Sequence, residues 1–142
     1  MDSSSIELPG SEIESVTLEN GILTVRFSRA YLIKTMTGSA ERTRWWQVGT
    51  LVFSDAEVDG TLPSGPVICA GGDVGENIYT YRDMIPIPLE SRGRAWCKLR
   101  WVGTPDLRAT ASGVRLVLEA MPRYIEHLRP GVTATRDQAS SV

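Results

Sequence analysis

The sequence has little of what catalysis and metal binding usually require. Its 142 residues include one histidine, His127, and two cysteines, Cys69 and Cys97, which are not spaced as a CxxC pair. A serine or cysteine nucleophile would need that single imidazole beside it, and there is no GxSxG elbow. A zinc site from one His and two Cys lacks its usual spacing. We predict no catalytic residues, no cofactor and no metal, and we favour a non-enzymatic protein while leaving activity open.

Long apolar runs, a surplus of positive charge and an export signal are also missing. No stretch approaches the about 20 apolar residues that span a bilayer. The chain has 15 basic and 17 acidic residues and a net charge of −2, which argues against neutralisation of nucleic-acid phosphates. The first residues lack the basic and apolar regions of a signal peptide. We expect a cytoplasmic protein with buried free thiols, and neither nucleic acid nor membrane as a partner.

What the sequence does contain is alternation of apolar and polar residues, which indicates half-buried strands. Residues 14–18 and 22–27 alternate on either side of Asn20-Gly21, a dipeptide that favours a tight hairpin turn. In residues 94–102 small and apolar side chains share one face with Trp101, while Trp96 shares the other face with basic residues. Further strands follow after short turns, so the region from residue 94 to residue 118 predicts a meander.

Two proline-containing stretches need separate interpretation. Residues 84–89 hold prolines at alternate positions, and a strand that lacks these N–H donors belongs at a sheet edge. Residues 122–128 begin with proline and place three apolar residues at helical spacing. This stretch is the one candidate for a short helix, although a period of two fits nearly as well.

Together these patterns predict an all-β fold of about eight to ten short strands, arranged as an antiparallel β-sandwich or a flattened β-barrel. At most one short C-terminal helix is expected. Residues 1–129 should form a single all-β domain, and the small, polar residues 130–142 a flexible C-terminal tail. Acids concentrate in residues 1–20 and bases in residues 26–46, so we expect these segments to neutralise each other across neighbouring strands.

Residues 69–78, with the sequence CAGGDVGENI, are the densest cluster of glycines and acids. They lack the GxxxxGK[ST] order of a phosphate-binding loop, and Glu76 would repel a phosphate. Asp73, Glu76 and Asn77 offer oxygen ligands that suit calcium, but without the order of an EF-hand they are weak metal candidates. We interpret the segment as a loop between strands in which the glycines permit positive φ.

Four tryptophans are many for a chain of this length. Trp45 and Trp46 are adjacent, so in a regular strand they face opposite sides. Trp96 shares its face with basic residues that include Arg100. Because Trp and Arg are enriched at interface hot spots, we predict that Trp45, Trp46, Trp96 and Arg100 contact a protein partner or a second copy in a homo-oligomer.

Other interpretations remain open. A ligand-binding barrel would place Tyr79, Tyr81 and Trp101 at its mouth, beside the loop 71–77, and would take a small ligand. The exposed indoles could stack on sugar or on single-stranded bases. The simplest alternative is that a loop or arginine stems cover the face that carries Trp96. Scattered carboxylates could also form a glycosidase-like pair, although acids that point outward from strands are usually solvated.

Overall fold

The computed structural model describes residues 3–36, 38 and 40–128, in which all regular structure is β. Nine strands form one antiparallel sheet, which confirms the predicted all-β class. The strands are β1 Ser3–Glu19, β2 Ile22–Thr35, β3 Arg42–Ser54, β4 Glu57–Asp59, β5 Val67–Glu76, β6 Tyr79–Arg82, β7 Met84–Ile87, β8 Glu90–Trp101 and β9 Thr104–Leu128.

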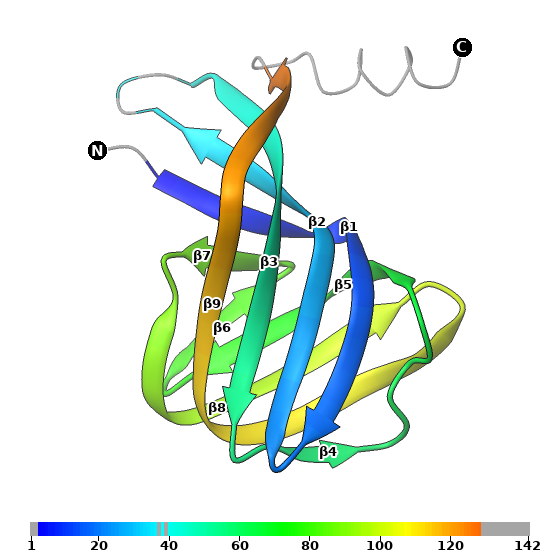
Figure 1. Cartoon of the computed structure of the whole chain (residues 1–142). Helices are drawn as coiled ribbons and strands as arrows, with labels where there is room; N and C mark the ends of the chain where they lie inside the picture. The colour runs from blue at the N-terminus through cyan, green and yellow to red at the C-terminus, as the bar shows by residue number, and fades with distance from the viewer. Residues whose placement is uncertain (1–2, 37, 39, 129–142) are drawn as a thin grey trace.

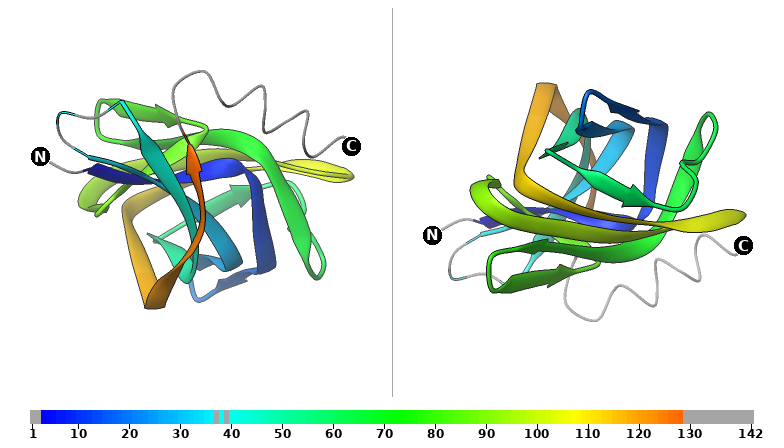
Figure 2. Two further views of the ribbon diagram at one scale, coloured as in Figure 1. Left: turned by 90° about the horizontal axis from the view of Figure 1, so that it is seen from above. Right: turned by 90° about the horizontal axis from the view of Figure 1, so that it is seen from below.

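The sheet closes on itself as a flattened barrel. Neighbouring strands follow the order β6–β5–β8–β9–β3–β2–β1–β7, and β5 also pairs with β1, where Glu12 lies opposite Ile68 and Ile13 opposite Val67. This pairing closes the ring β1–β2–β3–β9–β8–β5, which Figure 2 shows from above and below. Fully buried apolar side chains such as Phe53 fill the interior, as is usual in small barrels.

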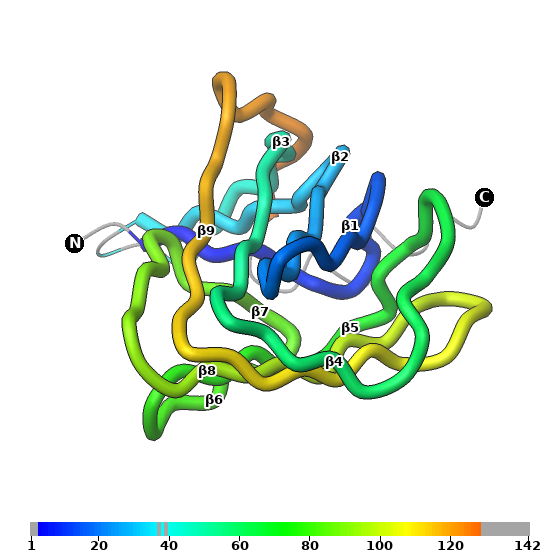
Figure 3. Tube along the Cα trace, turned by 60° about the horizontal axis from the view of Figure 1, so that its bottom comes forward, coloured from blue at the N-terminus to red at the C-terminus, as the bar shows by residue number. Residues whose placement is uncertain are grey.

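Beyond the barrel, the ends of β1, β2, β3 and β9 continue together as a smaller sheet. Figure 1 shows β3 and β9 rising above the ring, and Figure 3 shows the same part from a tilted view. The strand β7 pairs with the start of β1 and ends the sheet, which confirms the edge position predicted for the proline-containing strand. We call this part the projecting end, and it comprises residues 3–7, 30–35, 42–47, 84–87 and 123–128.

The strands are irregular at the level where they leave the barrel. The pairing register shifts at residues 8–11 of β1, at residues 28–29 of β2, and at residues 120–122 of β9 opposite Gln47 of β3. Extra residues in a strand bend it and increase its twist. We call this level the bulge band, and it separates the barrel from the projecting end.

In the bulge band, where the strand pairing is interrupted, two buried polar side chains form hydrogen bonds with backbone N–H and C=O groups. Ser11 is fully buried; its hydroxyl donates to the carbonyl of Glu7 at 2.6 Å and accepts from the N–H of Tyr31 at 3.1 Å. Gln47 is also buried, and its Nε2 donates to the carbonyl of Ala120 at 2.7 Å. Ala120 has a φ of 62°, a left-handed conformation that a non-glycine residue rarely adopts. These two side chains therefore support the bends on both sides of the sheet.

We expect Ser11→Ala to lower the free energy of unfolding by about 1–3 kcal/mol, because the Tyr31 N–H and the Glu7 carbonyl lose their partner in a part-buried place. Urea titration followed by tryptophan fluorescence measures this loss. Ser64→Ala is the control, since Ser64 is exposed and its loss should stay within about 0.5 kcal/mol. Equal effects of the two substitutions would contradict the supporting role of Ser11.

Two further sequence predictions are confirmed. The hairpin between β1 and β2 turns at Asn20 and Gly21, whose φ angles are 51° and 77°. The acidic first strand lies beside the basic second one, with Glu12 opposite Arg29. The predicted tail, residues 130–142, lies outside the described residues.

Three predictions of local structure are wrong. The meander predicted for residues 94–118 is a single hairpin, because β9 runs from Thr104 to Leu128 as one strand beside β8. Residues 122–128 form the end of β9 and not a helix, because Tyr124 lies opposite Trp45 and Glu126 opposite Arg44 in the β3–β9 ladder. Pairing across the sheet outweighs the weak helical spacing of so short a segment. Residues 71–76 form part of β5 and not a loop; the turn comes only at residues 77–78.

Candidate functional site

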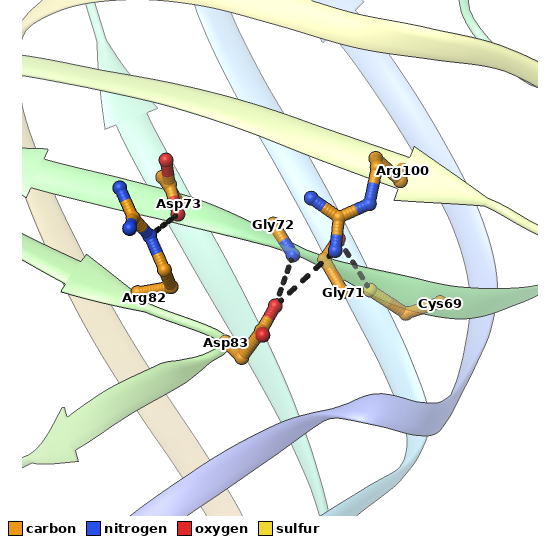
Figure 4. Close-up of polar contacts among 7 residues, drawn as sticks. All are labelled: Cys69, Gly71, Gly72, Asp73, Arg82, Asp83 and Arg100. Atoms are coloured by element: carbon orange, nitrogen blue, oxygen red, sulfur yellow. Dashed lines mark hydrogen bonds and ion pairs between the residues drawn. The ribbon is translucent and has the colours of Figure 1, made fainter.

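The glycines of β5 allow other elements to approach its backbone closely. A Cβ atom at Gly72 would overlap the carbonyl of Lys98 in the neighbouring strand. The N–H of Gly72 donates to Asp83 Oδ1 at 2.9 Å, and the same oxygen lies 3.4 Å from Arg100 Nη2, as Figure 4 shows. Arg100, predicted as a partner contact, thus forms an ion pair with Asp83. Asp83, which lies between β6 and β7, is thus hydrogen-bonded to the backbone of β5 at Gly72.

The weak metal candidates do not converge. Asp73 and Glu76 lie at positions of opposite parity in a regular part of β5, so they face opposite sides of the sheet. Asp73 Oδ1 lies 3.4 Å from Arg82 Nε, and Asn77 occupies the turn with a φ of 51°. Among the described residues no group of three His, Cys, Asp or Glu side chains could hold a metal ion.

Trp96 lies on the outer wall of the barrel, against the backbone of β5. It is paired with Gly75 across the ladder, and a Cβ atom at Gly75 would overlap the Trp96 indole. The indole therefore packs directly on the glycine and is only partly buried. An aromatic side chain that covers a strand glycine compensates for the missing side chain, so Gly75 and Trp96 form one structural unit.

We expect Gly75→Ala to destabilise the protein by about 1–3 kcal/mol, because the new methyl group displaces the indole. The φ of Gly75 is not in the positive range that disfavours alanine. In a Trp96→Ala background, Gly75→Ala should therefore be neutral or stabilising by about 0.5–1 kcal/mol. Urea unfolding of the four proteins measures this coupling, and additive effects would contradict the packing described.

At the projecting end, Trp45 and Trp46 face opposite sides of β3, as predicted. The ring of Trp45 makes an edge contact with Tyr124, with centroids 5.3 Å apart, and Lys34 Nζ lies 4.3 Å from the centroid of Trp45. On the other side, the guanidinium carbon of Arg29 lies 4.5 Å from the centroid of Trp46. Both indoles are partly exposed, so each offers an amphipathic surface beside a cation.

Three neighbouring apolar side chains of β9 are exposed at the same end. The exposed fraction is 81% for Met121, 55% for Tyr124 and 39% for Ile125. Met121 belongs to the bulge of the band, and Ile125 to a second register shift between Glu126 and Tyr124. Bulges redirect side chains, and each of these two irregularities leaves an apolar side chain exposed to solvent. We call Trp45, Met121, Tyr124 and Ile125 the β9 cluster.

The structure does not bring all the predicted contact residues together. Trp96 pairs with Thr110 near the start of β9, whereas Trp45 pairs with Tyr124 near its end. Trp96 therefore belongs to a different surface from Trp45 and Trp46.

The residues predicted to line a barrel mouth are also dispersed. Tyr79 and Tyr81 lie in β6 at an edge of the sheet, with Tyr79 exposed and Tyr81 packed in part against the core. Trp101 is 5% exposed and belongs to the core cluster. The segment 71–76 that should form the mouth is a paired strand. These residues do not form a mouth of the kind predicted.

The nucleophiles and the histidine occupy positions that do not favour catalysis. Burial raises the pKa of Cys97 to about 12 and that of Cys69 to about 11. Both thiols are free and buried, so at neutral pH they are protonated and weakly reactive. His127 is exposed, and its Nε2 lies 2.9 Å from Glu41 Oε2.

We expect neither thiol to react with a disulfide reagent in the folded protein at pH 7–8, and both to react in urea. The raised pKa values also make stability depend on pH. An unfolded thiol ionises near pH 9, before the folded one, so the free energy of unfolding is unaffected below about pH 9 and falls between about pH 9 and 12. Urea midpoints measured across this range test the fall, which Cys69→Ala/Cys97→Ala should reduce. Rapid labelling of the folded protein would contradict the burial.

Sequence reasoning missed most of the β9 cluster. Tyr124 and Ile125 were assigned to a possible helix, and nothing in the local sequence indicates that Tyr124 lies beside Trp45. The proline after Met121 is the one signal in the sequence, because a strand proline often accompanies a bulge.

Comparison of the chain with protein-family models, curated proteins and solved structures finds no match. Within the part of the chain that the structure describes, no helix is long and apolar enough to cross a membrane.

Proposed function

We propose that the chain is a non-enzymatic interaction domain that self-associates through the β9 cluster. The observation that carries this proposal is the exposure of Met121, Tyr124 and Ile125 within one short stretch of β9, where Tyr124 contacts the partly exposed Trp45. Such a group of apolar side chains on one end of a soluble domain is characteristic of a contact surface. Tyr, Trp and Met are also the residue types that interfaces favour.

The backbone of β9 supports the same surface. Beyond Leu116, whose N–H donates to the carbonyl of Leu89, β9 is paired with β3 alone among the described residues. Within residues 3–36, 38 and 40–128, the other edge of this part of β9 therefore has no paired strand. An open strand edge presents alternating N–H and C=O groups that another strand can bind. A second copy of the same edge is complementary to it, which suits a two-fold dimer.

Cations lie over both indoles of the projecting end, and Lys34, the one beside Trp45, would form part of the rim of this interface. Lys34 stacks on Trp45, and Arg29 and Arg123 lie over Trp46, with Arg123 5.6 Å from the ring centroid. These contacts hold the indoles in place before association, so that little side-chain entropy would be lost on binding. The two free thiols support placing this function in the cytoplasm, where thiols stay reduced.

We expect the wild-type chain to form a dimer, and Ile125→Lys to weaken its association at least about tenfold, because a charge would enter the apolar centre and the strand edge. Light scattering coupled to size-exclusion chromatography, over a range of concentrations, measures the change. Ile78→Lys is the matched control: Ile78 is 88% exposed in the turn between β5 and β6. A wild-type chain that stays monomeric, or equal effects of the two substitutions, would contradict the proposal.

A further inference from the structure

A groove of about 560 Å³ lies on the outer wall of the barrel, around Trp96. Small-ligand sites typically have volumes of about 300–1,000 Å³. Cross-strand pairing of β4, β9, β8 and β5 places residues in two parallel rows here. One row is Glu57, Thr110, Trp96 and Gly75; the next row is Asp59, Arg108, Lys98 and Asp73.

Small neighbours on both sides leave the indole of Trp96 accessible. On one side Gly75 has no side chain, and the indole packs on its backbone. On the other side Thr110 is the paired residue, and beyond it lies Glu57 of β4. The result is a fixed, flat aromatic surface at the side of a groove. An indole held in this way can stack on a ligand without losing rotamer freedom.

Five charged side chains line the groove. Glu57 and Asp59 form one wall, and Arg94, Lys98 and Arg108 line the remainder. Within residues 3–36, 38 and 40–128, none of these five takes part in a side-chain hydrogen bond or an ion pair. Two arginines of the neighbouring strands differ in this respect, since Arg82 pairs with Asp73 and Arg100 pairs with Asp83.

We propose that this groove binds a neutral, polyhydroxylated ligand, an oligosaccharide, with one sugar ring stacked on Trp96. Carboxylates only accept hydrogen bonds, and Lys and Arg only donate them, whereas a hydroxyl group does both. A sugar can therefore satisfy Glu57 and Asp59 on one wall and Arg108 or Lys98 on the other. The indole would cover the apolar C–H face of the ring.

An anionic ligand fits the groove less well. The carboxylates of Glu57 and Asp59 would repel a phosphate. Phosphate sites usually provide backbone N–H groups from a helix N-terminus or a nest. Here β8 and the start of β9, which carry Trp96, Lys98 and Arg108, are paired on both sides and use their N–H groups in the ladders. The row from Asp59 to Asp73 crosses four strands, or roughly 14 Å at about 4.8 Å per strand, which is room for more than one sugar ring.

The binding test uses two-dimensional ¹H–¹⁵N spectra of the wild-type chain, in which each of the four indole N–H groups has its own signal. The signal of Trp96 is assigned with Trp96→Phe. Maltotetraose, cellotetraose, chitotetraose and adenosine monophosphate are titrated separately to about 10 mM, because we expect a dissociation constant in the millimolar range for a carbohydrate in an open groove. A saturable shift of the Trp96 signal with at least one oligosaccharide, while the signal of Trp45 stays in place, supports the proposal.

Two variants separate binding from structural support by Trp96. Trp96→Ala removes the indole signal, so its binding is followed by backbone N–H signals in the same spectra. It should weaken binding about tenfold or more, as expected for loss of a stacking surface, but it also removes packing on Gly75. Glu57→Ala/Asp59→Ala changes exposed side chains and should weaken binding about fivefold or more without lowering the melting temperature. The proposal is overturned if no oligosaccharide shifts Trp96, if only the nucleotide does, or if the double variant binds like wild type.

Discussion

Where the strands leave the barrel, backbone N–H and C=O groups must come out of the ladder, and each needs a new partner inside the protein. The bulge band meets this requirement with two buried polar side chains, Ser11 and Gln47. Because these groups are satisfied, β1 can pair with β5 on one side of the band and with β7 on the other. Both the closure of the barrel and the direction of the projecting end depend on these bends.

The bulge band also explains why the two proposed surfaces differ in character. Below it the ladders of β8 with β5 and of β8 with the start of β9 are regular around Trp96, so outward side chains stand in rows and form a groove with polar walls. At the band and once more above it, the pairing of β9 with β3 is interrupted, and these interruptions expose apolar side chains such as Met121. Regular pairing yields a surface suited to an extended small ligand, whereas irregular pairing yields one suited to another protein.

Much of the local structure could be predicted because it depends on neighbours in the sequence. Alternation placed Trp96 and Trp101 on opposite faces, and one is indeed at the surface and the other in the core. The turn at Asn20-Gly21 follows from the preference of these residues for positive φ. What could not be predicted depends on register. Position 75 must be glycine because the indole of Trp96, from another strand, packs on its backbone. Ile125 is exposed because the pairing register of β3 and β9 shifts there, and no short sequence pattern encodes this shift.

Composition alone also could not distinguish structural arginines from those available for recognition. Arg100 and Arg108 are both exposed and both lie on the outer wall of the sheet, yet Arg100 is held by Asp83, which also binds the backbone of Gly72. Part of the hydrogen-bonding capacity of Arg100 is therefore already used within the protein. Arg108 and Lys98 have no such competing contact among the described residues. Availability therefore depends on intramolecular pairing, which favours the proposed ligand site at Trp96 over the residues around Gly72.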